Sequence, residues 1–131
     1  MNVINIFFGN PLAGSYSVVG TRTNYIGPVS GGVVGSVTNL SGSKAAVAID
    51  PANMSINYAN LGGNGWQYII TYDGSVISFK PNQTIIDQAA AGSFIAKSIT
   101  YDAATKVIHV ISEYTNGAGN GRLVDETWTK Q

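Results

Sequence analysis

WQYIITYDGSVISFK, residues 66–80, is the stretch that decides the fold class. Its two halves, 66–72 and 75–80, are rich in aromatic and β-branched residues, which favour strands. Asp73 and Gly74 separate the halves, and Asp-Gly is a strong hairpin signal because both residues tolerate a positive φ. The stretch therefore predicts two neighbouring antiparallel strands joined by a tight turn.

Similar short strands recur along the chain, separated by turn residues such as Gly, Asn, Asp and Pro. The expected strands are 14–22, 32–39, 44–50, 54–61, 66–72, 75–80, 93–101, 106–114 and 121–130. Short connections make sequential neighbours antiparallel, and closure of the meander removes its exposed edges. We therefore predict an all-β, up-and-down meander of eight or nine strands closed into a small barrel. A two-sheet β-sandwich is the alternative.

One segment departs from the strand pattern. Asn82 is a suitable N-cap for a short helix over 83–91, and Gly92 is placed to end it. The isoleucines and alanines of this segment lie along one stripe at helical spacing. The sequence therefore predicts one short helix in an otherwise all-β chain.

The composition indicates one globular domain and excludes several kinds of site. The 131 residues fit a single β-barrel domain over 10–131, with 1–9 as an extension or the remnant of a preceding segment. Seven basic and seven acidic residues give zero net charge. That balance argues against nucleic-acid binding, which needs a basic surface. The absence of cysteine excludes disulfides and thiolate metal sites.

The sequence also bears on location. No apolar stretch approaches the roughly 18 residues that a transmembrane helix needs, so we expect no membrane insertion of this domain. The start, MNVINIFFGN, has a short apolar run with no preceding Lys or Arg, unlike a signal peptide. The chain is then either cytoplasmic or part of a longer exported protein. Its 16 glycines and few Lys and Glu favour export to the cell surface or periplasm.

Catalytic chemistry has little support in the sequence. His109 is the one histidine, and depending on hairpin register Glu126 is a candidate neighbour; the alternative is a half-buried strand histidine satisfied by a nearby group. Asp125 and Glu126 point to opposite faces of a strand and cannot act as a pair. Most other carboxylates, such as Asp73, stand at turns that they stabilise. We expect no catalytic residues, no metal and no cofactor.

Aromatic and guanidinium side chains supply the candidate ligand-binding residues. Trp66 and Tyr68 offer rings that stack on sugars, and Asn64 and Gln67 offer hydrogen bonds to hydroxyl groups, although core packing is the ordinary role of such rings. Arg22 is a candidate for holding a ligand carboxylate inside the barrel, and Tyr25 lies near it in sequence. The alternative for Arg22 and Arg122 is a cross-strand ion pair, for which Glu113 is the nearest candidate.

Three segments carry a family resemblance: GSYSVVGTR at 14–22, DPANMSINYANLG at 50–62 and YDAATK at 101–106. Together they resemble a domain of unknown function found at the C-terminal end of surface lipoproteins of Bacteroidetes-type bacteria. The resemblance implies a lipocalin-like barrel, export, other domains in the same longer chain, and an association with glycan capture or adhesion. It implies no catalytic residues.

These observations predict a non-catalytic accessory or binding module of an exported cell-surface lipoprotein, with a glycan as the expected partner. The alternative is a lipocalin-like carrier of a small apolar ligand, which requires a hollow interior of about 300 Å³ or more. An enzyme is the third and least supported hypothesis, because the sequence identifies no nucleophile, base and oxyanion donors that would converge on one site.

Overall fold

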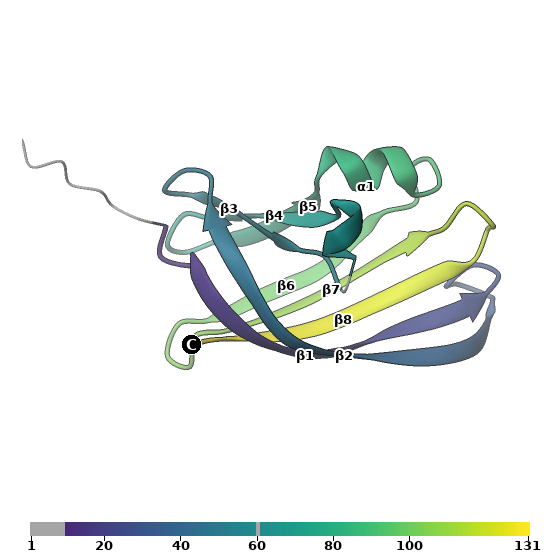
Figure 1. The fold of residues 1–131 in the computed structure, drawn as a ribbon, viewed down its shortest axis with the longest axis horizontal. Coiled ribbons are helices and arrows are strands. Elements are labelled where there is room, and N and C mark those ends of the chain that lie inside the picture. Colours follow the sequence, from purple (N-terminus) through teal and green to yellow (C-terminus); the bar gives the residue numbers. More distant parts are fainter. Residues whose placement is uncertain (1–9, 60) are drawn as a thin grey trace, which may run out of the picture.

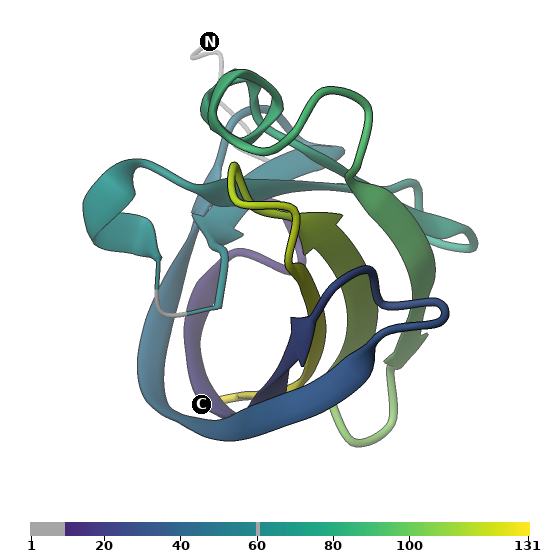
Figure 2. The ribbon, with the colours of Figure 1, turned by 90° about the vertical axis from the view of Figure 1, so that its right-hand side faces the viewer.

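Eight antiparallel strands form one continuous sheet that curls into a nearly closed barrel (Figures 1 and 2). The computed structural model describes residues 10–59 and 61–131, so the expected extension over 1–9 lies outside the described residues. The elements are β1 (Gly14–Ile26), β2 (Val33–Ala48), β3 (Asn53–Asn57), the 3-10 turn η1 (Gly62–Asn64), β4 (Gln67–Tyr72), β5 (Ile77–Pro81), α1 (Gln83–Gln88), β6 (Ile95–Asp102), β7 (Val107–Thr115) and β8 (Gly121–Lys130). The prediction of an antiparallel barrel with one short helix is confirmed.

The strand order explains how the sheet closes. It runs β5-β4-β3-β2-β1-β8-β7-β6, so β5 and β6 are the two ends of the sheet. Aromatic rings pack across the gap between these ends: Tyr72 on β4 lies 5.3 Å from Tyr101 on β6, and Phe79 on β5 lies 6.4 Å from Phe94, the residue before β6 (centroid distances). Side chains therefore contribute to closure between the two terminal strands.

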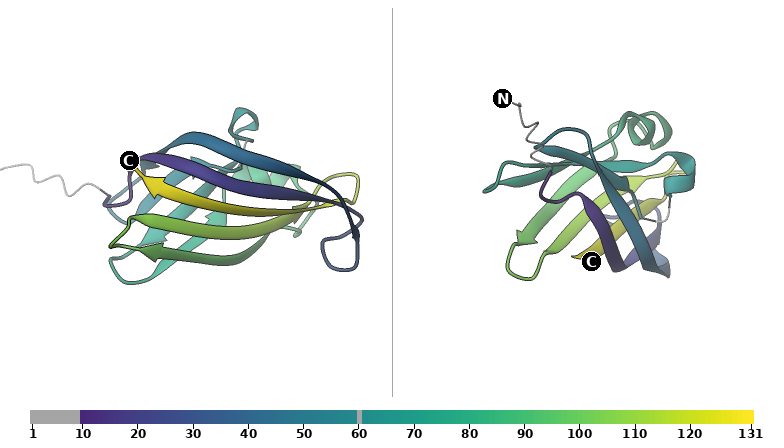
Figure 3. Two further views of the ribbon diagram at one scale, coloured as in Figure 1. Left: turned by 90° about the horizontal axis from the view of Figure 1, so that it is seen from below. Right: turned by 60° about the vertical axis from the view of Figure 1, so that its left-hand side comes forward.

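The two strands expected over 32–39 and 44–50 are one long bent strand, β2, which reduces the count to eight. The separation expected between them was wrong because Gly42, at φ 128°, bends the backbone while its pairing with Val18 continues. On its other side β2 pairs with β3 only at Val47 and Ala48. β2 thus splits from β3 along most of its length (Figure 3).

The expected hairpin forms with a longer loop than predicted, because β4 ends at Tyr72 and β5 begins at Ile77. Asp73 holds this loop: its Oδ1 accepts hydrogen bonds from the backbone N–H groups of Ser75 and Val76 at 2.9 and 2.8 Å. These bonds confirm the predicted turn role of Asp73.

Helix α1 begins as expected and ends early. The Asn82 side chain accepts a hydrogen bond from the Ile85 N–H at 3.1 Å, which confirms the predicted N-cap. The helix ends at Gln88 rather than residue 91, because Ala90 N–H instead donates to the carbonyl of Thr115 on β7 at 2.9 Å. No helix in the described part of the chain is long and apolar enough to cross a membrane.

Aromatic rings fill the barrel interior. Trp128 packs on Tyr16 and Tyr68, with ring centroids 6.4 and 5.3 Å apart. Tyr68 continues to Tyr58 at 4.6 Å, and Tyr58 to Trp66 at 5.8 Å. We call these five rings the aromatic column. All of them are buried, so the column occupies the space where a lipocalin-like barrel would hold its ligand.

Candidate functional site

The split between β2 and β3 opens a cavity in the side of the barrel. This side cavity has a volume of about 280 Å³. It is lined by Val18, Ser41, Gly42, Ser43, Lys44, Asn57, Ala59 and Gly63. The bend of β2 supplies one wall, and the segment that follows β3 supplies the opposite wall.

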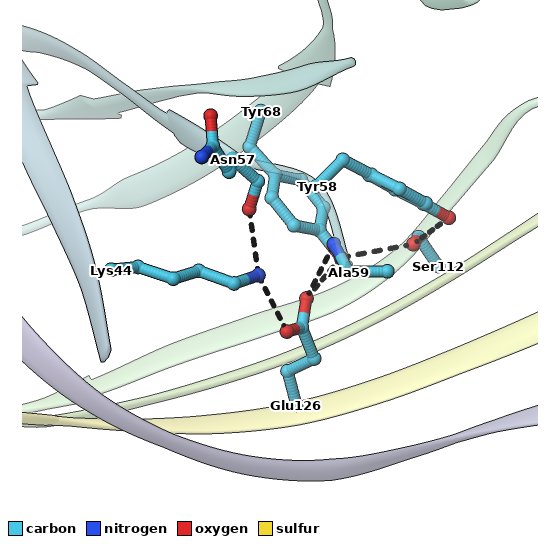
Figure 4. A network of polar contacts seen from close by, with 7 residues as sticks. All are labelled: Lys44, Asn57, Tyr58, Ala59, Tyr68, Ser112 and Glu126. Carbon is cyan, nitrogen blue, oxygen red and sulfur yellow. Dashed lines mark hydrogen bonds and ion pairs between the residues drawn. The ribbon is translucent and has the colours of Figure 1, made fainter. Parts of the chain in front are cut away.

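Lys44, which lines the side cavity, forms a buried ion pair with Glu126 (Figure 4). Lys44 Nζ is 2.7 Å from Glu126 Oε2, and the two side chains are 10% and 0% exposed. The ammonium also donates to the Asn57 carbonyl at 2.7 Å. These contacts use two of the three N–H donors of the ammonium, which also lies 5.8 Å from the centre of the Trp128 ring.

The second oxygen of Glu126 is held from another direction. Its Oε1 accepts hydrogen bonds from the Ala59 N–H at 3.2 Å and from the Tyr68 hydroxyl at 3.3 Å. Ala59 has a positive φ of 47°, uncommon for a residue with a Cβ. The bend at Ala59 also explains why β3 ends at Asn57 rather than continuing to residue 61.

Ser112 joins two tyrosines to this network. Its hydroxyl is 2.8 Å from the Tyr58 hydroxyl and 3.3 Å from that of Tyr68. Burial raises the pKa of Tyr58 and of Tyr68 well above the ordinary value, so both stay protonated donors at neutral pH. Burial lowers the pKa of Lys44, and the adjacent carboxylate of Glu126 opposes that effect.

The charge balance of the site limits what it can bind. The Lys44 ammonium is already compensated by Glu126, so the side cavity offers a polar donor without a net charge. Ser41 and Ser43 are exposed at its β2 wall, and Val18 adds an apolar surface. The arrangement suits a neutral molecule rich in hydroxyl or carbonyl groups.

The structure separates the residues predicted to bind a ligand. Trp66, only 6% exposed, packs against Tyr58 and Tyr114, and its Nε1 donates to Gln88 Oε1 at 2.7 Å. Tyr68 lies fully inside the barrel. Asn64 is exposed on η1, whereas Gln67 is half-buried at the start of β4. Trp66 and Tyr68 therefore share the aromatic column, and the joint ligand role of these residues stays a prediction.

Arg22 and Tyr25 lie on β1, a different strand from the other predicted ligand-binding residues. Arg22 is half-buried, and its Nε donates to Asn24 Oδ1 at 3.1 Å. Burial raises the pKa of Tyr114, and the guanidinium groups of Arg22 and Arg122 oppose that rise. Tyr25 is half-buried, and its carbonyl accepts a hydrogen bond from Arg122 at 3.3 Å. The role of Arg22 toward a ligand carboxylate stays a prediction.

His109 is a half-buried strand histidine with a nearby partner, as the alternative to a catalytic role predicted, and the candidate pairings of His109 with Glu126 and of Arg122 with Glu113 do not form. His109 contacts Asp125, with Nε2 2.7 Å from Oδ1, because these two residues share the outer face of the sheet whereas Glu126 points inward. Glu113 lies 3.7 Å from Lys97.

Arg122 does not face Glu113, because Tyr114 is its register partner and strand neighbours alternate between faces. Its Nη1 donates to the carbonyls of Tyr25 and Gly121.

Lys44 and Glu126 were not predicted to be partners. One signal was present: Glu126 alternates with Val124 and Trp128 and so belongs to the inward face of β8. Its partner depends on long-range packing, which strand periodicity does not supply. Within the described residues, no three metal-ligating side chains form a cluster.

No family model matches the chain, and no curated protein matches it. Solved structures do share its fold. An auxiliary nutrient binding protein from Bacteroides thetaiotaomicron has a TM-score of 0.58 at 14% identity, with 92% of this chain and 46% of that chain covered. A Bacteroides ovatus protein of unknown function has a TM-score of 0.56 at 10% identity, with 91% and 47% covered.

A third structure, a Bacteroides ovatus multidomain protein including DUF1735, has a TM-score of 0.55 at 11% identity, with 91% and 50% covered. The chain therefore spans about half the length of each of these structures. All three come from the bacterial group to which the sequence motifs pointed. At this level of identity the likeness shows a shared fold: this chain has the barrel architecture of one part of larger Bacteroides proteins.

Proposed function

We propose that this chain is a non-catalytic binding module of an exported cell-surface lipoprotein, and that its side cavity takes one neutral sugar unit of a glycan. The observation that carries the proposal is the cavity of about 280 Å³ in which the lining cation Lys44 is already neutralised by buried Glu126. The Lys44 ammonium and the two serines among the lining residues supply polar groups for the hydroxyls of a sugar.

The bonding around Glu126 supports a holding role over a catalytic one. Its two oxygens accept from Lys44, Ala59 and Tyr68, so the carboxylate already has three partners. A general base needs access to the proton that it takes from the substrate. The Lys44 ammonium already donates hydrogen bonds to Glu126 and to the Asn57 carbonyl, which fits a holding role as well.

The aromatic column bears on the alternative, a carrier of a small apolar ligand. Such a ligand would have to displace rings that already pack on one another at 4.6–6.4 Å. The side cavity offers space without that rearrangement. The interior packing therefore favours binding at the side of the barrel.

The comparisons support the setting of the proposal. One structure with this fold is described as an auxiliary nutrient binding protein, and another belongs to a multidomain protein. We therefore place this domain beside other domains of a longer chain at the cell surface or in the periplasm. Protease treatment of intact cells tests this part: surface exposure predicts loss of the full-length band while a cytoplasmic marker survives.

Titration of the purified protein with neutral and charged saccharides, followed by calorimetry and NMR, tests the binding site. We expect neutral sugars to shift resonances of Ser41, Ser43 and Asn57, which line the side cavity. Ser43→Tyr should obstruct the cavity and abolish these shifts. Ser17→Tyr is the matched control, because Ser17 is the exposed register partner of Ser43 on β1 and does not line the cavity.

Two results would overturn the proposal. One is that no saccharide in the panel binds the folded protein. The other is that Ser43→Tyr binds as tightly as the unmodified chain. Release of a cleaved or altered sugar during a prolonged incubation would overturn the non-catalytic part.

A further inference from the structure

The first part of β2 has a strand neighbour on one side only. Residues 33–46 pair with β1, whereas the pairing with β3 is confined to Val47 and Ala48. In an antiparallel sheet the N–H and C=O groups of a strand alternate between its two neighbours. Along the first part of β2, the N–H and C=O groups that point away from β1 therefore lie at the open edge of the five-stranded layer β2-β1-β8-β7-β6 (Figure 3).

Side-chain exposure agrees with this edge position. Along β7, which has neighbours on both sides, half-buried and buried residues alternate. From Val33 to Val37 every residue of β2 is exposed. Val33, Val34 and Val37 are more than half exposed, at 69%, 52% and 55%. An apolar strand edge of this kind is a template for pairing with another strand.

The usual protection of such an edge is missing. Natural sheets place Lys, Pro or inward-pointing charges on exposed edge strands, but residues 23–43 contain no charged residue and β2 has no proline before residue 49. One protective device is present: the register shifts between Asn24 and Tyr25, so that Gly35 bulges. The regular edge therefore begins at Ser36 and extends to Ser41, next to the bend at Gly42.

We propose that the edge Ser36–Ser41 pairs antiparallel with the same edge of a second copy of this chain. A twofold axis perpendicular to the sheet would join the two five-stranded layers into one continuous layer. This interface is isologous, because the same segment contributes from both copies. It does not depend on the function proposed for the side cavity.

The absence of charge makes the edge Ser36–Ser41 compatible with a second copy of itself. Self-pairing brings identical side chains close together, so a strand with lysines or glutamates repels itself. The segment over 36–41, SVTNLS, brings no like charges together. The twofold axis also places residues of the outer face opposite residues of the outer face. Two registers satisfy this condition: Val37 lies opposite either Val37 or Asn39 of the partner subunit. In both registers only apolar or neutral side chains meet.

A matched pair of lysine variants tests the interface. Val37→Lys introduces an ammonium from each copy into the pairing edge. Val47→Lys makes the same change on the same strand at a similarly exposed residue, 60% against 55%, where β2 is paired with β3 and lies outside the proposed interface. Circular dichroism and thermal unfolding first establish that both variants keep the native fold.

Sedimentation velocity over a concentration series then measures association. We expect the unmodified chain and Val47→Lys to dimerise, and Val37→Lys to weaken dimerisation by at least about tenfold. Hydrogen exchange should show amides of residues 36–41 becoming more protected as concentration rises. A native protein that stays monomeric up to about 1 mM overturns the proposal. So does a dimer that Val37→Lys leaves intact, or an edge that pairs only with a peptide of different sequence.

Discussion

Lys44 and Glu126 lie 82 positions apart in the chain, yet their charged groups are 2.7 Å apart inside the barrel. Their strands, β2 and β8, flank β1 on its two sides. On β1, Glu126 lies opposite Gly20 and Lys44 lies opposite Tyr16, so the ion pair crosses this strand diagonally. The ion pair therefore ties together strands that do not pair with each other.

Removal of either partner of this ion pair should strongly destabilise the fold. Lys44→Met leaves the fully buried Glu126 without its cation, and Glu126→Leu leaves the Lys44 ammonium uncompensated. Each single change should lower the free energy of unfolding by about 3–5 kcal/mol. The double variant should recover most of that loss, because an apolar pair often replaces a buried ion pair at little cost. Urea denaturation measures the free energy of unfolding of the two single variants and the double variant. If the loss in the double variant equals the sum of the two single losses, Lys44 and Glu126 are not coupled.

Gly20 is required by the close approach of β1 and β8. A Cβ at this position would lie 2.1 Å from the Asp125 carbonyl oxygen. Gly20→Ala should therefore cost about 1–3 kcal/mol or more, since backbone must shift to make room. Gly117→Ala is the control, because a Cβ there meets nothing within 4 Å. Thermal unfolding of the two variants should differ clearly; equal melting temperatures would show that the strands separate easily.

Stability should fall above pH 10. Burial raises the pKa of Tyr16 to about 12 and raises the pKa values of Tyr58, Tyr68 and Tyr114 as well. Above pH 10 the tyrosines of the unfolded chain lose their protons, whereas the buried tyrosines of the folded chain keep them. The free energy of unfolding that is present below pH 10 therefore decreases as the pH rises. The lowered pKa of Lys44 has the opposite effect on stability, but it concerns one group, whereas four tyrosines have raised pKa values.

Denaturation at pH 8 and at pH 11 measures this dependence. Tyr58→Phe removes one of the four groups, and should reduce the loss of stability between these two pH values. An unfolding free energy that is constant or rises over this range would contradict the assignment of buried, protonated tyrosines.

Asn82 should contribute to stability mainly as a helix cap. Asn82→Ala removes the acceptor for the Ile85 N–H and should cost about 1 kcal/mol. Asn82→Asp keeps that acceptor but loses the donor to the Gly65 carbonyl. We expect it to lower the free energy of unfolding less than Asn82→Ala does, and the difference measures the contribution of the bond to Ile85. Chemical denaturation compares them; equal losses in both variants would assign the effect to the Gly65 contact instead.

Local signals were enough to predict most of the barrel. Alternation in KVIHVISEY marks β7, Asn82 marks the start of α1, and Asp73 marks its turn. Strand continuity was harder to predict. The SGS sequence over 41–43 reads as a break, but a glycine in a paired strand also permits a bend, and only the partner strand decides between these outcomes.

The candidate site was less predictable than the fold. Trp66 was favoured because its ring and neighbours have sugar-binding chemistry, but burial depends on what the rest of the chain packs against it. Glu126 was considered only as a neighbour of His109. A carboxylate within an apolar inward stripe signals a buried partner, yet the identity of that partner, Lys44, follows from register across three strands.

The short junction between β2 and β3 has a consequence for local unfolding. Two register pairs, Val47 with Ser55 and Ala48 with Met54, join β3, β4 and β5 to the rest of the sheet's hydrogen-bond ladder. This three-stranded unit therefore separates from the barrel with few broken backbone bonds, at the cost of ring contacts such as that between Tyr72 and Tyr101. We expect β3, β4 and β5 to open together before the rest of the barrel, because the hydrogen-bond ladders that join β1, β8 and β7 are much longer.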